Sequence, residues 1–119
     1  HATPGHTPGC TTWTLPTRVE GRRVDALFLC GVTAPGYRLV GNRAYPNALG
    51  DFRGSFATLK QLPCDLFLGA HGGYYGLTEK RAEMARTGSA KPFIDPKGCR
   101  AYLAKAEQSI EQTAAKQAG

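Results

Sequence analysis

The chain has 119 residues, enough for one small domain, and its 41% hydrophobic and 20% charged residues indicate a globular protein. No stretch approaches the roughly 20 apolar residues that a membrane-spanning helix needs. The net charge of +6 comes from dispersed basic residues with acids among them, and no finger, knuckle or basic-aromatic stripe accompanies them. We therefore expect neither nucleic acid nor a membrane among the partners.

The first third of the chain predicts two short strands and a long loop. Residues 11–15 are β-branched and aromatic, and Trp13 is expected to lie in the core. Residues 24–30 contain the run Ala-Leu-Phe-Leu-Cys, which favours burial on both faces. The two segments are expected to pair as a hairpin across residues 16–23. The glycine- and proline-rich residues 31–46 are expected to form a loop, and loops of this length are often functional.

The rest of the chain predicts helices around one more strand. Residues 51–60 carry three large apolar side chains at helical spacing, and residues 64–68 resemble a short buried strand before a glycine-rich turn. A helix over residues 78–86 is expected to be capped by Thr78. Asp95 is expected to cap the last helix, with Pro96 in its first turn. The order β-β-α-β-α-α indicates an α/β layer whose sheet is small for an independent domain.

Two of the three histidines lie in glycine-rich loops. His6 stands in Gly-His-Thr-Pro-Gly, and His71 follows an apolar strand in Ala-His-Gly-Gly. Small neighbours leave room for a ligand on an imidazole, and imidazole suits zinc. A solvated or hydrogen-bonded histidine is the alternative for each. The third, His1, is interpreted as incidental.

Several colinear stretches carry a more specific pattern. They are His-Ala-Thr-Pro-Gly-His-Thr-Pro-Gly-Cys-Thr-Thr-Trp-Thr (1–14), Thr-Ala-Pro-Gly-Tyr-Arg-Leu-Val-Gly-Asn (33–42), Tyr-Pro-Asn (45–47), Asp-Phe-Arg-Gly-Ser-Phe-Ala-Thr-Leu (51–59), Leu-Pro-Cys-Asp-Leu-Phe-Leu-Gly-Ala-His-Gly (62–72) and Cys-Arg-Ala-Tyr (99–102). In these stretches the chain resembles the C-terminal half of subclass B3 metallo-β-lactamases. The resemblance implies an α/β fold over residues 1–119: the C-terminal half of the αββα sandwich, a mixed sheet with helices on its outer face.

The resemblance also implies a zinc-dependent hydrolase of β-lactam antibiotics, including penicillins, cephalosporins and carbapenems. His6 matches the histidine that completes a three-histidine zinc site, and His71 matches the one that completes a second zinc site. Two Zn²⁺ ions then hold a bridging hydroxide that attacks the lactam carbonyl. The other four ligands come from a His-x-His-x-Asp-His motif, and these 119 residues contain none.

Other site residues follow from the same resemblance. Thr33 matches a serine that helps to hold the substrate carboxylate, and its alternative is an ordinary loop hydroxyl. Gly31 stands where many members have another serine, so one carboxylate contact is expected to be lost. Tyr37 resembles a pocket tyrosine that could stabilise negative charge, or it packs the loop. Tyr74 and Tyr75 could line the rim or serve as packing.

The four cysteines, at positions 10, 30, 64 and 99, lack the close spacing of a zinc site, so disulfides in an oxidising compartment are expected. Cys64 and Cys99 match a disulfide of the subclass. Cys10 opens one strand of the proposed hairpin and Cys30 closes the other, so a second bridge is sensible, with two free thiols as the alternative. A periplasmic or secreted bacterial protein is implied.

With one ligand for each zinc, the chain by itself is expected to be inactive, because zinc sites need three or four protein ligands. The missing N-terminal half, or a second chain, is the expected partner. Two rival hypotheses remain: another hydrolase of the same fold, acting on a lactone, thioester or phosphoester, and an inactive fragment. A half-sheet exposes an apolar face, so the lone chain is expected to associate or to be poorly soluble.

Overall fold

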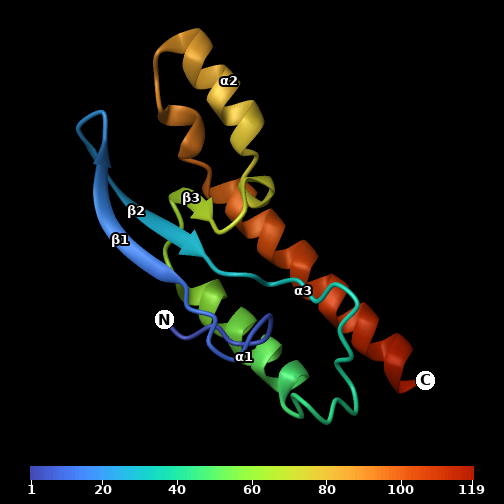
Figure 1. Ribbon diagram of the computed structural model, residues 1–119. Helices are drawn as coiled ribbons and strands as arrows, with labels where there is room; N and C mark the ends of the chain where they lie inside the picture. Colours follow the sequence, from blue (N-terminus) through green and yellow to red (C-terminus); the bar gives the residue numbers. More distant parts are fainter.

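A three-stranded mixed sheet with helices packed on one side forms the fold, as a computed structural model of residues 1–119 shows (Figure 1). The elements are β1 (Trp13–Val19), β2 (Arg22–Leu29), α1 (Ala48–Gln61), β3 (Leu66–Gly69), α2 (Leu77–Thr87) and α3 (Pro96–Ala118), with short 3-10 turns η1 (Gly72–Tyr74) and η2 (Lys91–Phe93). The strand order is β1-β2-β3, antiparallel and then parallel. The predicted order of elements and the α/β class are confirmed.

The β1–β2 hairpin is longer and tighter than the sequence predicted. Val19 pairs with Arg22, so only Glu20 and Gly21 form the turn. Both have positive φ, 50° and 81°, which suits a two-residue hairpin loop. The expected connection over residues 16–23 is therefore wrong, because β-strand pairing continues through Pro16 on the edge strand.

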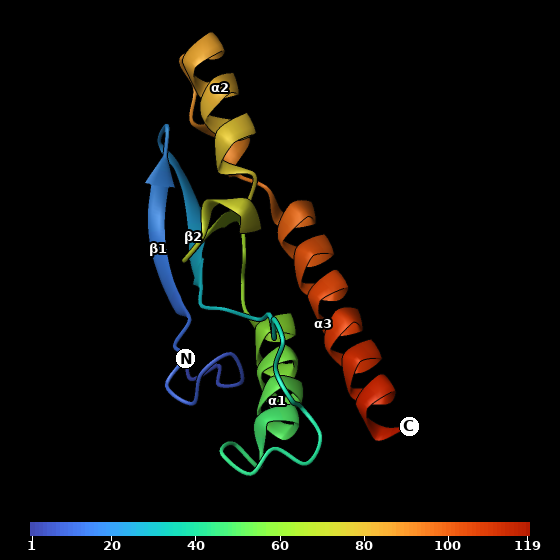
Figure 2. The same cartoon turned by 45° about the vertical axis from the view of Figure 1, so that its right-hand side comes forward.

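The two faces of the sheet differ in their cover. Leu27 and Leu29 of β2 pack into the main core with α1 and α3. On the opposite face Trp13, Leu15 and Phe28 are 66%, 53% and 40% exposed. Figure 2 shows both helices on one side of the sheet and none on the other. The expected core position of Trp13 is therefore wrong: its strand faces outward on the uncovered side.

Helix α1 provides the stripe that joins the sheet to α3. Its buried side chains include Phe52, Phe56 and Leu59, as the spacing predicted, but the helix begins at Ala48 and not at residue 51. On α3, Leu103 and Ile110 are buried in the same core. Arg53 and Lys60 of α1 form ion pairs with α3, and exposed pairs of this kind contribute little beyond alignment.

Helix α2 begins one residue before the expected cap. Gly76, with φ 67°, is its N-cap, so Thr78 lies inside the first turn and caps nothing. Asp95 does cap α3, because its side chain accepts from the amide of Gly98. Burial would raise the pKa of Asp95, but Lys80 at 3.0 Å and the Gly98 amide lower it below its usual value. This carboxylate therefore links α2 to α3.

Both expected disulfides are present, Cys10–Cys30 and Cys64–Cys99, and no cysteine is free. The first joins the N-terminal loop to the residue after β2. The second joins the residues before β3 to the first turn of α3. None of the helices has the length and hydrophobicity needed to cross a bilayer.

Candidate functional site

The two loop histidines lie at the same edge of the sheet. β2 and β3 are parallel, so their carboxyl ends meet there. The amide of Ala70, next to His71, donates to the carbonyl of Leu29, the last residue of β2, at 3.0 Å. His6 rests on Gly31, two residues after that strand ends. The fold therefore brings to neighbouring strand ends two histidines that are 65 residues apart in the sequence.

The half-buried imidazole of His6 is held in one orientation. Its Nδ1 lies 2.6 Å from the backbone carbonyl of Thr33. A carbonyl can only accept, so Nδ1 carries the proton and Nε2 of the neutral ring keeps its lone pair. In a metal-binding histidine, the ring nitrogen that does not bind the metal usually donates a hydrogen bond to a backbone carbonyl, a carboxylate or water. His6 is therefore prepared to offer Nε2 to a metal ion.

Glycine at position 31 makes room for that ring. A Cβ atom there would lie 2.6 Å from Cγ of His6, so a side chain would force the imidazole to move. From the family resemblance, Gly31 was expected only to lose a serine contact with the substrate carboxylate. The structure gives this position a steric role, because His6 packs directly on its backbone.

His71 is held much less firmly. It is exposed, in extended conformation just before η1, and its ring packs nearly perpendicular to that of Tyr74, with centroids 5.4 Å apart. Behind it, Tyr74 stacks at an angle on Tyr102. Burial raises the pKa of Tyr74, and burial with a smaller effect of Tyr74 raises that of Tyr102 to about 12. An uncharged aromatic wall therefore backs His71 at neutral pH.

The donor types fit zinc, but the number of donors does not. No group of three or more histidine, cysteine, aspartate or glutamate side chains in the chain could hold a metal ion. Imidazole is a good zinc ligand, yet a zinc site needs three or four protein ligands. The structure therefore contains one oriented imidazole, one exposed imidazole and no complete metal site.

Thr33 and Tyr37 lie around His6. Thr33 is exposed, and its carbonyl accepts a hydrogen bond from Nδ1 of His6. The Tyr37 hydroxyl donates to the carbonyl of His6 at 2.9 Å, and the two rings stack with centroids 5.7 Å apart. Their expected contacts with substrate remain predictions, but the structure adds that both residues support the histidine.

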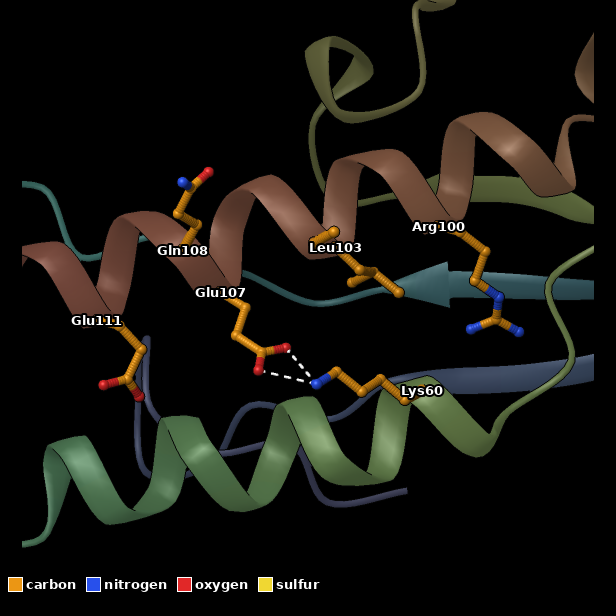
Figure 3. Close-up of a pocket in the computed structure, with 7 residues that line it drawn as sticks. Lys60, Arg100, Leu103, Glu107, Gln108 and Glu111 are labelled. Carbon is orange, nitrogen blue, oxygen red and sulfur yellow. Dashed lines mark hydrogen bonds and ion pairs between the residues drawn. The ribbon is translucent and has the colours of Figure 1, made fainter.

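A shallow hollow of the surface lies elsewhere. It measures about 390 Å³ between α1 and α3, where Lys60 and Glu107 form an ion pair across it (Figure 3). Neither loop histidine lines it. The hollow is shallow and lies between two exposed helix faces. Because it is away from both loop histidines, it is not the candidate site.

Comparisons with known proteins place the chain among solved structures of similar sequence and fold. No protein-family model matches the chain. Among solved structures, the native FEZ-1 metallo-β-lactamase from Legionella gormanii is 37% identical, with a TM-score of 0.93, and the match covers 98% of this chain. BJP-1, a subclass B3 metallo-β-lactamase of Bradyrhizobium japonicum, is 38% identical, with a TM-score of 0.90 and 99% of this chain covered. In sequence and fold, the chain corresponds to the C-terminal half of subclass B3 metallo-β-lactamases.

That correspondence is partial in length. The chain spans 45% of the Legionella enzyme and 44% of the Bradyrhizobium enzyme. A metallo-β-lactamase from Cronobacter sakazakii gives the same proportion, 44%, at 37% identity and a TM-score of 0.89. More than half of each such enzyme therefore has no counterpart in the 119 residues.

Gln117 was missed by sequence reasoning. Its amide oxygen accepts from Leu39 at 2.6 Å and Val40 at 3.1 Å, and its amide nitrogen donates to the carbonyl of Tyr37 at 2.8 Å. Nothing in its local sequence indicates this contact, because its partners lie 77 to 80 residues away.

Proposed function

We propose that this chain forms half of a two-zinc β-lactam hydrolase, with His6 and His71 each donating one ligand to a different Zn²⁺ ion. The observation that carries the proposal is the placement of both imidazoles at one sheet edge, in a chain similar to β-lactamases over nearly its whole length. When bound, zinc lowers the pKa of a water molecule and polarises the lactam carbonyl.

The chain's own residues hold the zinc ligands in place and orient the substrate. His6 offers Nε2 because Thr33 occupies Nδ1, and this fixes both the tautomer and the direction of the lone pair. The exposed Thr33 hydroxyl donates to the substrate carboxylate. Tyr37, whose ring stacks on the imidazole of His6, is proposed to lie near the reacting carbonyl, where a phenol stabilises negative charge. The neutral tyrosines behind His71 exclude water from that side.

The other four zinc ligands come from a segment with a His-x-His-x-Asp-His motif. We propose that this segment, in the same protein or in a second chain, packs on the uncovered face of the sheet. Trp13, Leu15 and Phe28 provide apolar area there. The two disulfides support a periplasmic or secreted bacterial protein. Resistance to penicillins, cephalosporins and carbapenems is the proposed consequence.

The test joins this chain to an N-terminal segment of a subclass B3 enzyme bearing that motif. The fusion is expected to bind two zinc ions and to hydrolyse a chromogenic cephalosporin, and a chelator abolishes the activity. His6→Ala and His71→Ala each remove one zinc ion and the hydrolysis. His1→Ala is the matched control, because His1 is exposed and bonds only to Thr14 and Thr12.

The outcomes separate the rival functions. Zinc-dependent lactam hydrolysis by the 119-residue chain alone would overturn the half-site proposal. Faster turnover of a lactone or thioester than of any β-lactam by the fusion would favour another hydrolase of this fold. A fusion that folds but binds no zinc would indicate an inactive fragment.

A further inference from the structure

We propose that Gln117 and Tyr37 are positioning residues for His6: together they transmit the position of helix α3 to the zinc-binding imidazole. The inference rests on the proposed role of His6 as a zinc ligand. It assigns a function to the C-terminal turn of α3, which is remote from both histidines in sequence. The teal loop beside the C-terminal end of α3 in Figure 1 is the connecting segment.

The first link joins α3 to the loop. Gln117 uses both ends of its amide on one segment: it accepts from the amides of Leu39 and Val40 and donates to the carbonyl of Tyr37. Three hydrogen bonds from one side chain fix the path of residues 37–40. Leu39 is also buried, only 2% exposed, so the segment is anchored by packing as well.

The second link joins the loop to His6. The phenol of Tyr37 donates to the backbone carbonyl of His6 at 2.9 Å, and its ring stacks on the imidazole at an interplanar angle of 26°. The backbone and the ring of His6 are thus both held by one side chain. Because Gln117 fixes the backbone of Tyr37, the position of that side chain depends on α3.

The third link joins His6 to the start of the same loop. His6 Nδ1 donates to the carbonyl of Thr33, four residues before Tyr37 in the same loop. The loop therefore contacts the imidazole at two residues, Thr33 near its start and Tyr37 near its middle. Residues 30–47 contain no helix or strand, and such a segment is mobile unless it is tied down. Gln117 is the tie that comes from a long helix.

A purely structural role is the competing explanation, and the two differ in what a mutation changes. Loss of a structural contact loosens α3 and the core together. Loss of a positioning contact loosens residues 37–40 and the His6 loop, and leaves the sheet and α1 unchanged. The amides of Leu39 and Gly5 report on the two loops, because Leu39 donates to Gln117 and Gly5 donates to Thr7.

The experiment measures amide hydrogen exchange and the ¹⁵N shifts of the His6 ring in the oxidised, zinc-free chain. In Gln117→Ala, exchange at Leu39 and Gly5 is expected to rise about two- to tenfold, the effect of losing a typical hydrogen bond. The Nδ1-protonated fraction of His6 falls in the same variant. Gln117→Glu keeps the acceptor for Leu39 and Val40 and is expected to restore most of the protection at Leu39.

Tyr37→Phe tests the second link without removing the ring. It is expected to speed exchange at Gly5 and lower the Nδ1-protonated fraction, while Leu39 keeps its protection. Gln112→Ala, exposed on the same helix, and Tyr75→Phe, which removes a hydroxyl without a partner, are the matched controls and change neither reporter. Thermal unfolding of each variant shows that it is folded.

Unchanged His6 shifts and Gly5 exchange in both Gln117→Ala and Tyr37→Phe would overturn the inference. So would a uniform rise in exchange over α1 and the sheet, since that pattern marks general destabilisation. Failure of the proposed function is distinguishable: the fusion then binds no Zn²⁺, while the zinc-free reporters still respond to the two variants.

Discussion

The surroundings of His6 and His71 differ more than their sequences suggest. His6 stands in a loop closed by a disulfide, packs on the backbone of Gly31, stacks on a tyrosine and donates from Nδ1 to a backbone carbonyl. His71 follows a strand, is exposed, and meets one aromatic edge. Both stand in glycine-rich loops, yet one imidazole is oriented before metal arrives and the other is not.

This difference indicates two modes of completing a metal site. An oriented ligand loses little conformational entropy on binding, so the His6 side of the proposed zinc centre is preorganised. In the proposed centre, the His71 side is ordered by the segment that brings the remaining ligands. We therefore expect changes around His6 to affect the isolated chain, and changes around His71 to appear only in the complete enzyme.

The largest effect is expected from the disulfides. Replacing Cys10 and Cys30 by alanine is expected to lower the free energy of unfolding by about 3 kcal/mol, and replacing Cys64 and Cys99 by about 4 kcal/mol, because the second bridge closes the longer loop. Chemical denaturation of the two double variants measures these values.

The two bridges are expected to differ in their effect on His6. Loss of Cys10–Cys30 frees the loop that contains His6, so amide exchange at Gly5 rises well beyond the global change. Loss of Cys64–Cys99 leaves Gly5 exchange in step with global stability. If Gly5 exchange in the two double variants is equal after correction for their difference in global stability, the Cys10–Cys30 bridge has no specific effect on the His6 loop.

The next largest loss of stability is expected from a substitution at Gly31, on which the His6 ring packs. Gly31→Ala places a Cβ 2.6 Å from the His6 ring, and overpacking of this kind costs about 1–3 kcal/mol. Gly73→Ala on the His71 side is the matched control, because a Cβ there meets nothing within 4 Å. Denaturation midpoints and His6 ring shifts are the measurements, and a Gly31→Ala variant with native shifts would remove the steric role of Gly31.

Local patterns predicted much of this molecule. The stripe of Phe52, Phe56 and Leu59 identified α1, and Asp95 before a proline identified the start of α3. The strand geometry and the family resemblance led to both disulfides. These features depend on short-range spacing or on strand ends that pair in one way.

The errors and omissions depend on contacts across the fold. The exposure of Trp13 depends on what covers its face of the sheet, and strand composition alone does not reveal that. The steric role of Gly31 depends on a ring 25 residues away. Gln117 resembles any polar residue at the end of a helix until the loop at residues 37–40 is placed beside it.

The smallest effect separates the two histidines themselves. His6→Ala removes a hydrogen bond to Thr33 and a stacked contact with Tyr37, so a loss of about 1 kcal/mol is expected in the isolated chain. His71→Ala removes an exposed ring and is expected to change stability by less than about 0.5 kcal/mol. Denaturation curves of the two variants, measured side by side, give the two losses of stability. Equal losses would mean that the His71 loop is as ordered as the His6 loop, whereas the expected inequality would place the preorganised half of the centre at His6 and leave His71 to be fixed by its partner segment.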